Sequence, residues 1–107
     1  MTKHMICALL MSGLITTSAL VHADGNAAAG RKEAETCMGC HAIEGYFNVY
    51  PSYHVPRIGG QQAGYIASAL KAYRDGGRKH DTMHANASNL SDDMIADIAA
   101  YVSSQGK

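Results

Sequence analysis

The sequence predicts a small all-α domain, with three main helices and long loops wrapped around one covalently attached cofactor. Apolar residues recur at helical spacing in three stretches of the chain. A long irregular stretch at 43–61 separates the first two helices, and the first helix runs into Cys37-Met38-Gly39-Cys40-His41, a motif that binds a cofactor. No stretch of the sequence has a pattern that predicts a β-strand.

The N-terminal segment 1–23 has the features of a secretory signal peptide. A short basic start precedes an apolar stretch at 5–21, and Val21-His22-Ala23 supplies small residues for cleavage. A membrane anchor is the alternative, but Ser, Gly and Thr interrupt the apolar stretch and no stop-transfer pattern follows. We therefore expect a cleaved signal peptide at 1–23 and one domain at 24–107, located in the periplasm with no membrane span. Cys7 would leave with the signal.

The first helix is expected at about 26–37, where alanines favour helix and Asp24 or Asn26 can cap its start. Gly30 in this helix is small enough to allow a close crossing with another helix. The helix delivers the motif at 37–41 to the cofactor.

Cys-x-x-Cys followed directly by His is the spacing that attaches a c-type haem. The thiols of Cys37 and Cys40 become thioethers to the porphyrin, and the imidazole of His41 is placed to bind the iron. Zinc and a redox dithiol are weaker alternatives, because 24–107 has no second cysteine pair and no βαβ context. One haem c, covalent and containing iron, is the expected cofactor, and it would also stabilise a domain with a thin core.

Two further helices are expected after the loop. The second covers about 62–75 and ends at Gly76-Gly77, which suit a C-terminal cap. The third starts after the cap Ser91 with two aspartates in its first turn, where the helix dipole favours anions. In this helix Ala99 or Ala100 could meet Gly30 in a close crossing.

The stretches around the second helix are expected to enclose the haem. The first of them, 43–61, holds tyrosines that could bury against the porphyrin, and the segment 76–90 would close the other side. In that segment Met83 lies outside any predicted helix, and its thioether is a soft ligand suited to haem iron. Met38 lies too close to the cysteines to reach the opposite face, and Met94 fits the apolar stripe of the third helix. Met83 is the expected sixth ligand.

Three histidines are most simply solvated loop residues: His54, His80 and His84. His80 and His84 are also rivals of Met83 for the iron, because they lie close to it in the chain.

Charge is balanced over the chain, with 9 Lys and Arg against 9 Asp and Glu, so no nucleic acid is expected as a partner. Basic residues nonetheless concentrate in the segment from Arg57 to Lys79. This segment could dock redox partner proteins, and solvated helix faces are an equally weighted alternative.

Short motifs spread over most of 24–107 carry a family resemblance: Cys37-Met38-Gly39-Cys40-His41, Pro56-Arg57-Ile58-Gly59-Gly60-Gln61, Tyr65-Ile66 with Leu70, Tyr73-Arg74-Asp75-Gly76, Met83, and Leu90-Ser91-Asp92 leading to Ile98-Ala99-Ala100-Tyr101. Together they resemble the class I cytochromes c, and within them the haem domains of periplasmic bacterial cytochromes of the dihaem type. The resemblance implies a small cytochrome c fold in which Cys37 and Cys40 hold the haem and His41 and Met83 bind the iron. It also implies that the carbonyl of Pro56 accepts the second imidazole N–H of His41.

Three features depart from that pattern. One haem motif is present, which makes this a monohaem chain. His84 follows Met83 where many relatives have proline, and the stretch Tyr46–Tyr53 matches nothing in the family pattern.

The function implied is one-electron transfer, with no catalytic residues. An iron held by two strong ligands has no open site for a substrate, and the redox chemistry belongs to the haem. A tightly bound cytochrome subunit of a periplasmic oxidoreductase is an alternative. A haem enzyme or sensor with a displaceable sixth ligand is a weaker one.

Overall fold

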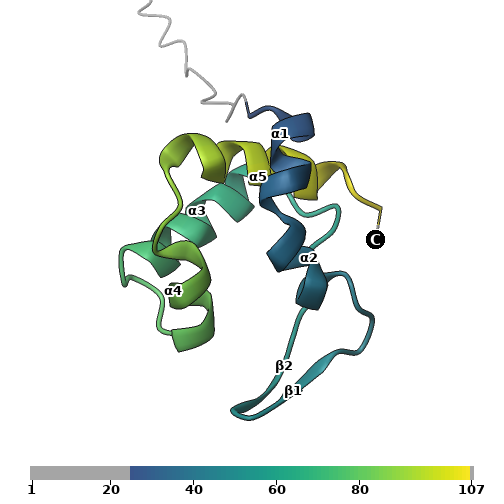
Figure 1. Cartoon of the computed structure of the whole chain (residues 1–107), viewed down its shortest axis with the longest axis vertical. Helices are drawn as coiled ribbons and strands as arrows, with labels where there is room; N and C mark the ends of the chain where they lie inside the picture. Colours follow the sequence, from purple (N-terminus) through teal and green to yellow (C-terminus); the bar gives the residue numbers. More distant parts are fainter. Residues whose placement is uncertain (1–24, 107) are drawn as a thin grey trace, which may run out of the picture.

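The computed structural model describes residues 25–106, so the predicted signal peptide at 1–23 and Cys7 lie outside the described residues. The elements follow in the order α1 (Ala27–Glu33), α2 (Glu35–His41), β1 (Phe47–Val49), β2 (Ser52–His54), α3 (Ala63–Arg74), α4 (Asp81–Ala87) and α5 (Asp92–Ser104). α1 and α5 cross at one end of the molecule, and α4 and the hairpin of β1 and β2 lie at the other (Figure 1). The all-α class is confirmed, with one small hairpin added.

The first predicted helix is divided in two. The Asn26 side chain caps α1, accepting hydrogen bonds from the backbone N–H groups of Ala28 at 2.9 Å and Ala29 at 3.2 Å. The chain then turns at Ala34, whose ψ of 2° departs from helical values, and continues as α2. Ala34 is fully buried, so this turn is fixed in the core while α2 carries the Cys-x-x-Cys-His motif away from it.

The core is centred on the crossing of α1 and α5. Gly30 lies so close to α5 that a Cβ atom there would overlap the backbone carbonyl of Asp97. The close crossing predicted for Gly30 is therefore confirmed, with Ala99 fully buried in α5. Side chains of α5 fill the space beside it, and Ile95, Ile98 and Val102 are buried almost completely.

α3 packs against α5 and adds Ile66 and Leu70 to the core. Its bounds agree with the predicted second helix. Gly76 has a φ of 82°, a left-handed conformation that ends the helix at little cost for glycine. The amide of Arg78 then returns to the Ala72 carbonyl at 3.0 Å, so the chain turns sharply toward α4.

The hairpin was not predicted. β1 and β2 pair antiparallel in the register Phe47 with His54, Asn48 with Tyr53 and Val49 with Ser52. Each strand has three residues, which is too short for a clear alternation in the sequence. The hairpin places Tyr53 on its inner side and leaves Val49 82% exposed at its tip.

The prediction that Met83 lies outside a helix is wrong, because Met83 belongs to α4. This helix has 7 residues and buries Ala87 alone, so it has no apolar stripe that the sequence could reveal. Its N-cap is His80, whose ring Nδ1 accepts the backbone N–H of Met83 at 3.4 Å, whereas Ser, Thr, Asp and Asn are the usual caps. No helix among residues 25–106 is long and apolar enough to cross a bilayer.

Candidate haem site

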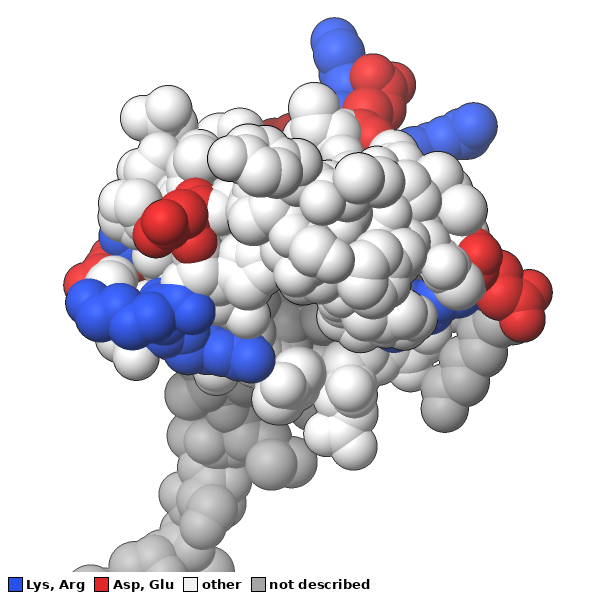
Figure 2. Space-filling view, turned by 90° about the horizontal axis from the view of Figure 1, so that it is seen from below, with Lys and Arg blue, Asp and Glu red and all other residues white. Residues whose placement is uncertain are grey.

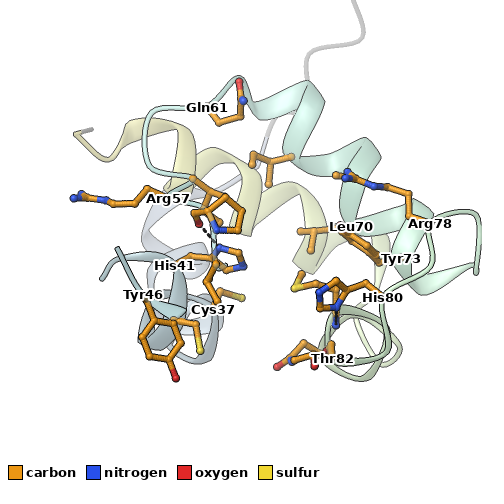
Figure 3. A pocket seen from close by; sticks show the side chains of 18 of the residues that line it. Cys37, His41, Tyr46, Arg57, Gln61, Leu70, Tyr73, Arg78, His80 and Thr82 are labelled. Atoms are coloured by element: carbon orange, nitrogen blue, oxygen red, sulfur yellow. Dashed lines mark hydrogen bonds between the residues drawn. The ribbon is translucent and has the colours of Figure 1, made fainter. Parts of the chain in front are cut away.

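A cavity of about 370 Å³ opens between two walls of the fold. One wall consists of α2, the hairpin and the loop that follows it, and the other consists of α3 and α4. Figure 3 shows His41 and Cys37 on one side and Leu70, Tyr73 and His80 facing them. The residues that the sequence predicted for the site come together here, since Cys37, Cys40, His41, Pro56 and Met83 all line this cavity.

The wall that includes α2 carries the two cysteines and the histidine of the motif on one face of that helix. Residues three and four apart share a face of a helix, so Cys37, Cys40 and His41 all point to the same cavity. Neither cysteine is in a disulfide. Burial raises the pKa of the Cys37 thiol, which is the deeper of the two.

The orientation of His41 is fixed by the loop after the hairpin. Its Nδ1 lies 2.6 Å from the carbonyl oxygen of Pro56, which can only accept. Nδ1 therefore carries the proton, and Nε2 keeps its lone pair free to bind a metal.

The opposite wall presents one methionine to the cavity. Of the three methionines in residues 25–106, Met83 lines the cavity, whereas Met38 and Met94 do not. Met38 packs instead against the hydrophobic core, and Met94 lies partly buried in α5.

The interpretation of the three histidines as solvated loop residues holds only in part, because His54 and His84 are exposed but lie in β2 and α4, and His80 is half-buried. His80 lines the cavity and packs edge-on against the ring of Tyr53, with centroids 4.7 Å apart. His84 lies in α4, where its Nδ1 is 2.8 Å from the Tyr73 carbonyl, and it is not part of the cavity lining. His54 is exposed in β2 and contributes to the lining. Of the two histidines that the sequence left as rivals of Met83, His80 therefore lines the cavity and His84 does not.

Much of the basic segment Arg57–Lys79 is paired with carboxylates. Arg74 contacts Asp92 at 2.8 Å and Asp75 at 2.9 Å, and Lys71 reaches Asp92 at 3.4 Å. The hydrogen bond from Arg74 lowers the pKa of each aspartate below its ordinary value. Seen from the hairpin end, charged side chains lie toward the margins and the middle of the face is uncharged (Figure 2).

The side chains fit a c-type haem. Two thiols and an oriented imidazole face a thioether across a cavity whose lining includes apolar residues of the core, Ile66, Leu70 and Ile98. Arg57 and Arg78 also line it, so the cavity has positive charge at its border, which suits a cofactor that carries carboxylates. A flat, largely apolar cofactor with a charged edge matches this combination.

Comparisons with known proteins agree with the geometry. The family model for cytochrome c matches residues 27–106. Cytochrome c-554(548) of Halomonas halodenitrificans is 49% identical over 84 residues, which cover 76% of this chain and 98% of the relative. Cytochrome c4 of Pseudomonas aeruginosa is 38% identical over 105 residues, covering 98% of this chain and 49% of the relative.

The fold has a counterpart among solved structures. The crystal structure of reduced recombinant cytochrome c4 from Pseudomonas stutzeri matches with a TM-score of 0.56 and 27% identity, covering 77% of this chain and 52% of that one. The chain thus spans about half the length of both cytochromes c4 and nearly all of the Halomonas relative.

Proposed function

The chain belongs to the cytochrome c family, and we propose that it is a periplasmic one-electron carrier whose haem iron is bound by His41 and Met83. Cytochromes c are electron-transfer proteins with a covalently attached haem, so this chain is an electron carrier and not an enzyme. The haem, when bound, supplies the one-electron redox chemistry. The chain supplies anchors, axial ligands and a largely apolar pocket.

Cys37 and Cys40 are the proposed anchors, because both thiols line the cavity from one face of α2. His41 is the proposed fifth ligand. The Pro56 carbonyl, 2.6 Å from Nδ1, fixes the ring in the tautomer that leaves Nε2 free for iron. A ligand held in this way need not reorganise when the charge on the iron changes, which favours fast electron exchange.

Met83 is the proposed sixth ligand, and one observation carries this assignment. Among residues 25–106, Met83 is the methionine that lines the cavity, and it follows Thr82 in α4, which lies opposite His41. A thioether is a soft ligand that favours ferrous iron over ferric, so it raises the reduction potential relative to a second imidazole.

A spectroscopic experiment tests this assignment. Methionine bound to ferric haem gives a weak far-red charge-transfer band, which the oxidised protein should show. Met83→Ala should remove the band, lower the reduction potential and either open the iron to external ligands or pass it to a histidine. Met94→Leu should do none of this, because Leu for Met in a helix face usually costs less than about 1.5 kcal/mol. The assignment is wrong if the band survives in Met83→Ala, or if the wild type lacks it and readily binds carbon monoxide.

Redox proteins are the partners of a cytochrome c, and we propose that the basic segment Arg57–Lys79 takes part in docking them. Within this segment Lys71 and Arg74 are held by Asp92. The structure pairs neither Arg78 nor Lys79 with a carboxylate among residues 25–106. Arg78 also lines the cavity, with its guanidinium carbon 4.6 Å from the centroid of the Tyr73 ring.

Oxidation by ferricyanide, an anionic reagent, tests this docking role. The rate should fall with rising salt, and Lys79→Gln should lower the rate at low salt more than the paired Lys71→Gln does. Equal effects of the two variants would favour solvated helix faces over a docking surface.

The proposed periplasmic location rests on the predicted signal peptide at 1–23, with the domain at 24–107. Expression of the whole chain in a bacterium, followed by mass spectrometry of the periplasmic protein, should give a chain that begins at Asp24 and carries one haem. A chain that retains 1–23 in the membrane would contradict it.

A second candidate is a tightly bound cytochrome subunit of a periplasmic oxidoreductase. The observation that favours it is the apolar hairpin, with Phe47 53% and Val49 82% exposed. Gel filtration of the native periplasmic fraction, followed by its haem absorbance, separates the two candidates. A free carrier elutes at the size of the single chain, and a subunit elutes with its enzyme.

A further inference from the structure

We propose that the hairpin of β1 and β2 acts as a clasp that holds the Met83 side of the pocket in place, with Tyr53 as the positioning residue. The proposal rests on the proposed ligation of iron by Met83. It gives a role to the stretch Tyr46–Tyr53, which matched no family pattern in the sequence.

Tyr53 joins two segments that are 29 residues apart in the chain. Its hydroxyl donates a hydrogen bond to Oγ1 of Thr82 at 3.0 Å. Its ring meets the His80 ring edge-on, with centroids 4.7 Å apart and planes at 80°. Both contacts run from the hairpin to the start of α4, and Tyr53, His80 and Thr82 all line the pocket.

The two residues that Tyr53 contacts determine where Met83 lies. Thr82 precedes Met83 in the first turn of α4. His80 caps the same turn, and its Nδ1 accepts the backbone N–H of Met83 at 3.4 Å. A shift of Tyr53 would therefore be passed to Met83 through its neighbour and through its own amide.

α4 is held from two sides, by α3 and by the hairpin. It is 7 residues long and buries Ala87 alone, and a helix this short is not stable without tertiary contacts. On the side of α3 it is held by Tyr73, whose carbonyl lies 2.8 Å from Nδ1 of His84 and whose ring lies 6.3 Å from that of His80. On the side of the hairpin it is held by Tyr53.

The clasp connects the two walls of the pocket. His41 belongs to α2 and Met83 to α4, and Figure 3 shows His41 on one side of the pocket with His80 and Thr82, at the start of α4, on the other. The covalent anchors, Cys37 and Cys40, belong to the His41 wall alone, so they do not restrain α4. A contact that holds α4 against the hairpin keeps the thioether close to the iron and slows its release.

The test measures how fast imidazole replaces the sixth ligand in the ferric holoprotein. Tyr53→Phe removes the hydroxyl and keeps the ring on His80, while Thr82→Val removes the acceptor at nearly the same volume. Each variant should speed replacement by about fivefold, the factor expected for one ordinary hydrogen bond. The double variant should match the single ones, because all three lose the same bond. The reduction potential of both single variants should fall. Tyr50→Phe is the control, since Tyr50 is on the same hairpin and 95% exposed, and it should behave as wild type.

Three outcomes would overturn the clasp: an unchanged rate in Tyr53→Phe, an effect as large in Tyr50→Phe, or additive effects in the double variant. The failure of Met83 ligation looks different. In that case the wild type itself lacks the methionine charge-transfer band, and imidazole binds to the iron without displacing a methionine.

Discussion

The crossing of α1 with α5 and the half of the molecule built from the hairpin and α4 differ in what their side chains pack against. At the crossing, Ile95 and Val102 are fully buried and do not line the cavity. In the other half, Val55 and Ala87 are the buried residues, and Tyr53 and Met83 face the cavity. One half has a protein core, and the other is arranged around a space that fits haem.

So small a domain needs a source of stability besides its protein core. A domain of this size buries too little surface for a large margin of stability, and a bound group commonly supplies the rest. The crossing can form from contacts within the chain. The hairpin has few such contacts, and α4 packs against α3 while burying Ala87 alone, so the order of this half depends more on the haem and on the clasp.

The largest expected effect is the loss of a haem anchor. Cys37→Ala or Cys40→Ala should abolish stable holoprotein, because the half with little protein core then has no fixed group to pack against. Visible absorbance and thermal unfolding of the purified protein measure this. Met38→Leu, within the same motif, should still yield holoprotein. A double cysteine variant that stays folded without haem would show that the half with the hairpin and α4 does not depend on haem.

An added methyl group tests the close crossing in the other half. Gly30→Ala places a Cβ against the Asp97 carbonyl, so the free energy of unfolding should fall by about 1–3 kcal/mol despite the better helix propensity of Ala. Gly64→Ala is the matched control in α3, where a Cβ meets nothing within 4 Å. It should be neutral or stabilising by up to about 1 kcal/mol. Denaturant unfolding of the holoprotein measures both, and stabilisation by Gly30→Ala would show that the crossing is not tight.

The smallest expected effect concerns the ion pairs between α3 and α5. Because the pKa of Asp92 is lowered in the folded state, its stabilising effect is present above its ordinary pKa of 3.8 and disappears as the pH falls through the lower folded value. Asp92→Asn should therefore unfold more easily than wild type at pH 7, and this difference should vanish in acid.

Asp93→Asn is the control for this pair, because Asp93 shares the first turn of α5 but has no ion pair within 25–106. It loses the same charge from the helix N-terminus. Unfolding by urea at a series of pH values gives the comparison. Equal curves for the two variants would mean that the helix dipole, and not the contacts with Arg74 and Lys71, accounts for the effect.

Local sequence patterns were sufficient for much of the fold. The bounds of α3 and the start of α5 follow from helical spacing with a capping Ser91 and a terminal Gly76, because these signals act within a few residues of one another. α4 and the hairpin were missed, because each is short and is held by contacts with distant residues. A histidine cap and strands of three residues carry no strong local signal.

The sequence by itself determined the cofactor and the family, because Cys37-Met38-Gly39-Cys40-His41 is a local motif whose chemistry depends on spacing along a single chain segment. The sequence also indicated Met83, with His80 and His84 as rivals, and the packing of α4 settles which of the three line the cavity. It placed Met83 and His80 in the cavity, kept His84 out of it, and brought Tyr53 to Thr82. The physical reason is that such contacts depend on how α4 and the hairpin pack across a cavity, and this packing joins residues too far apart for any sequence spacing to reveal.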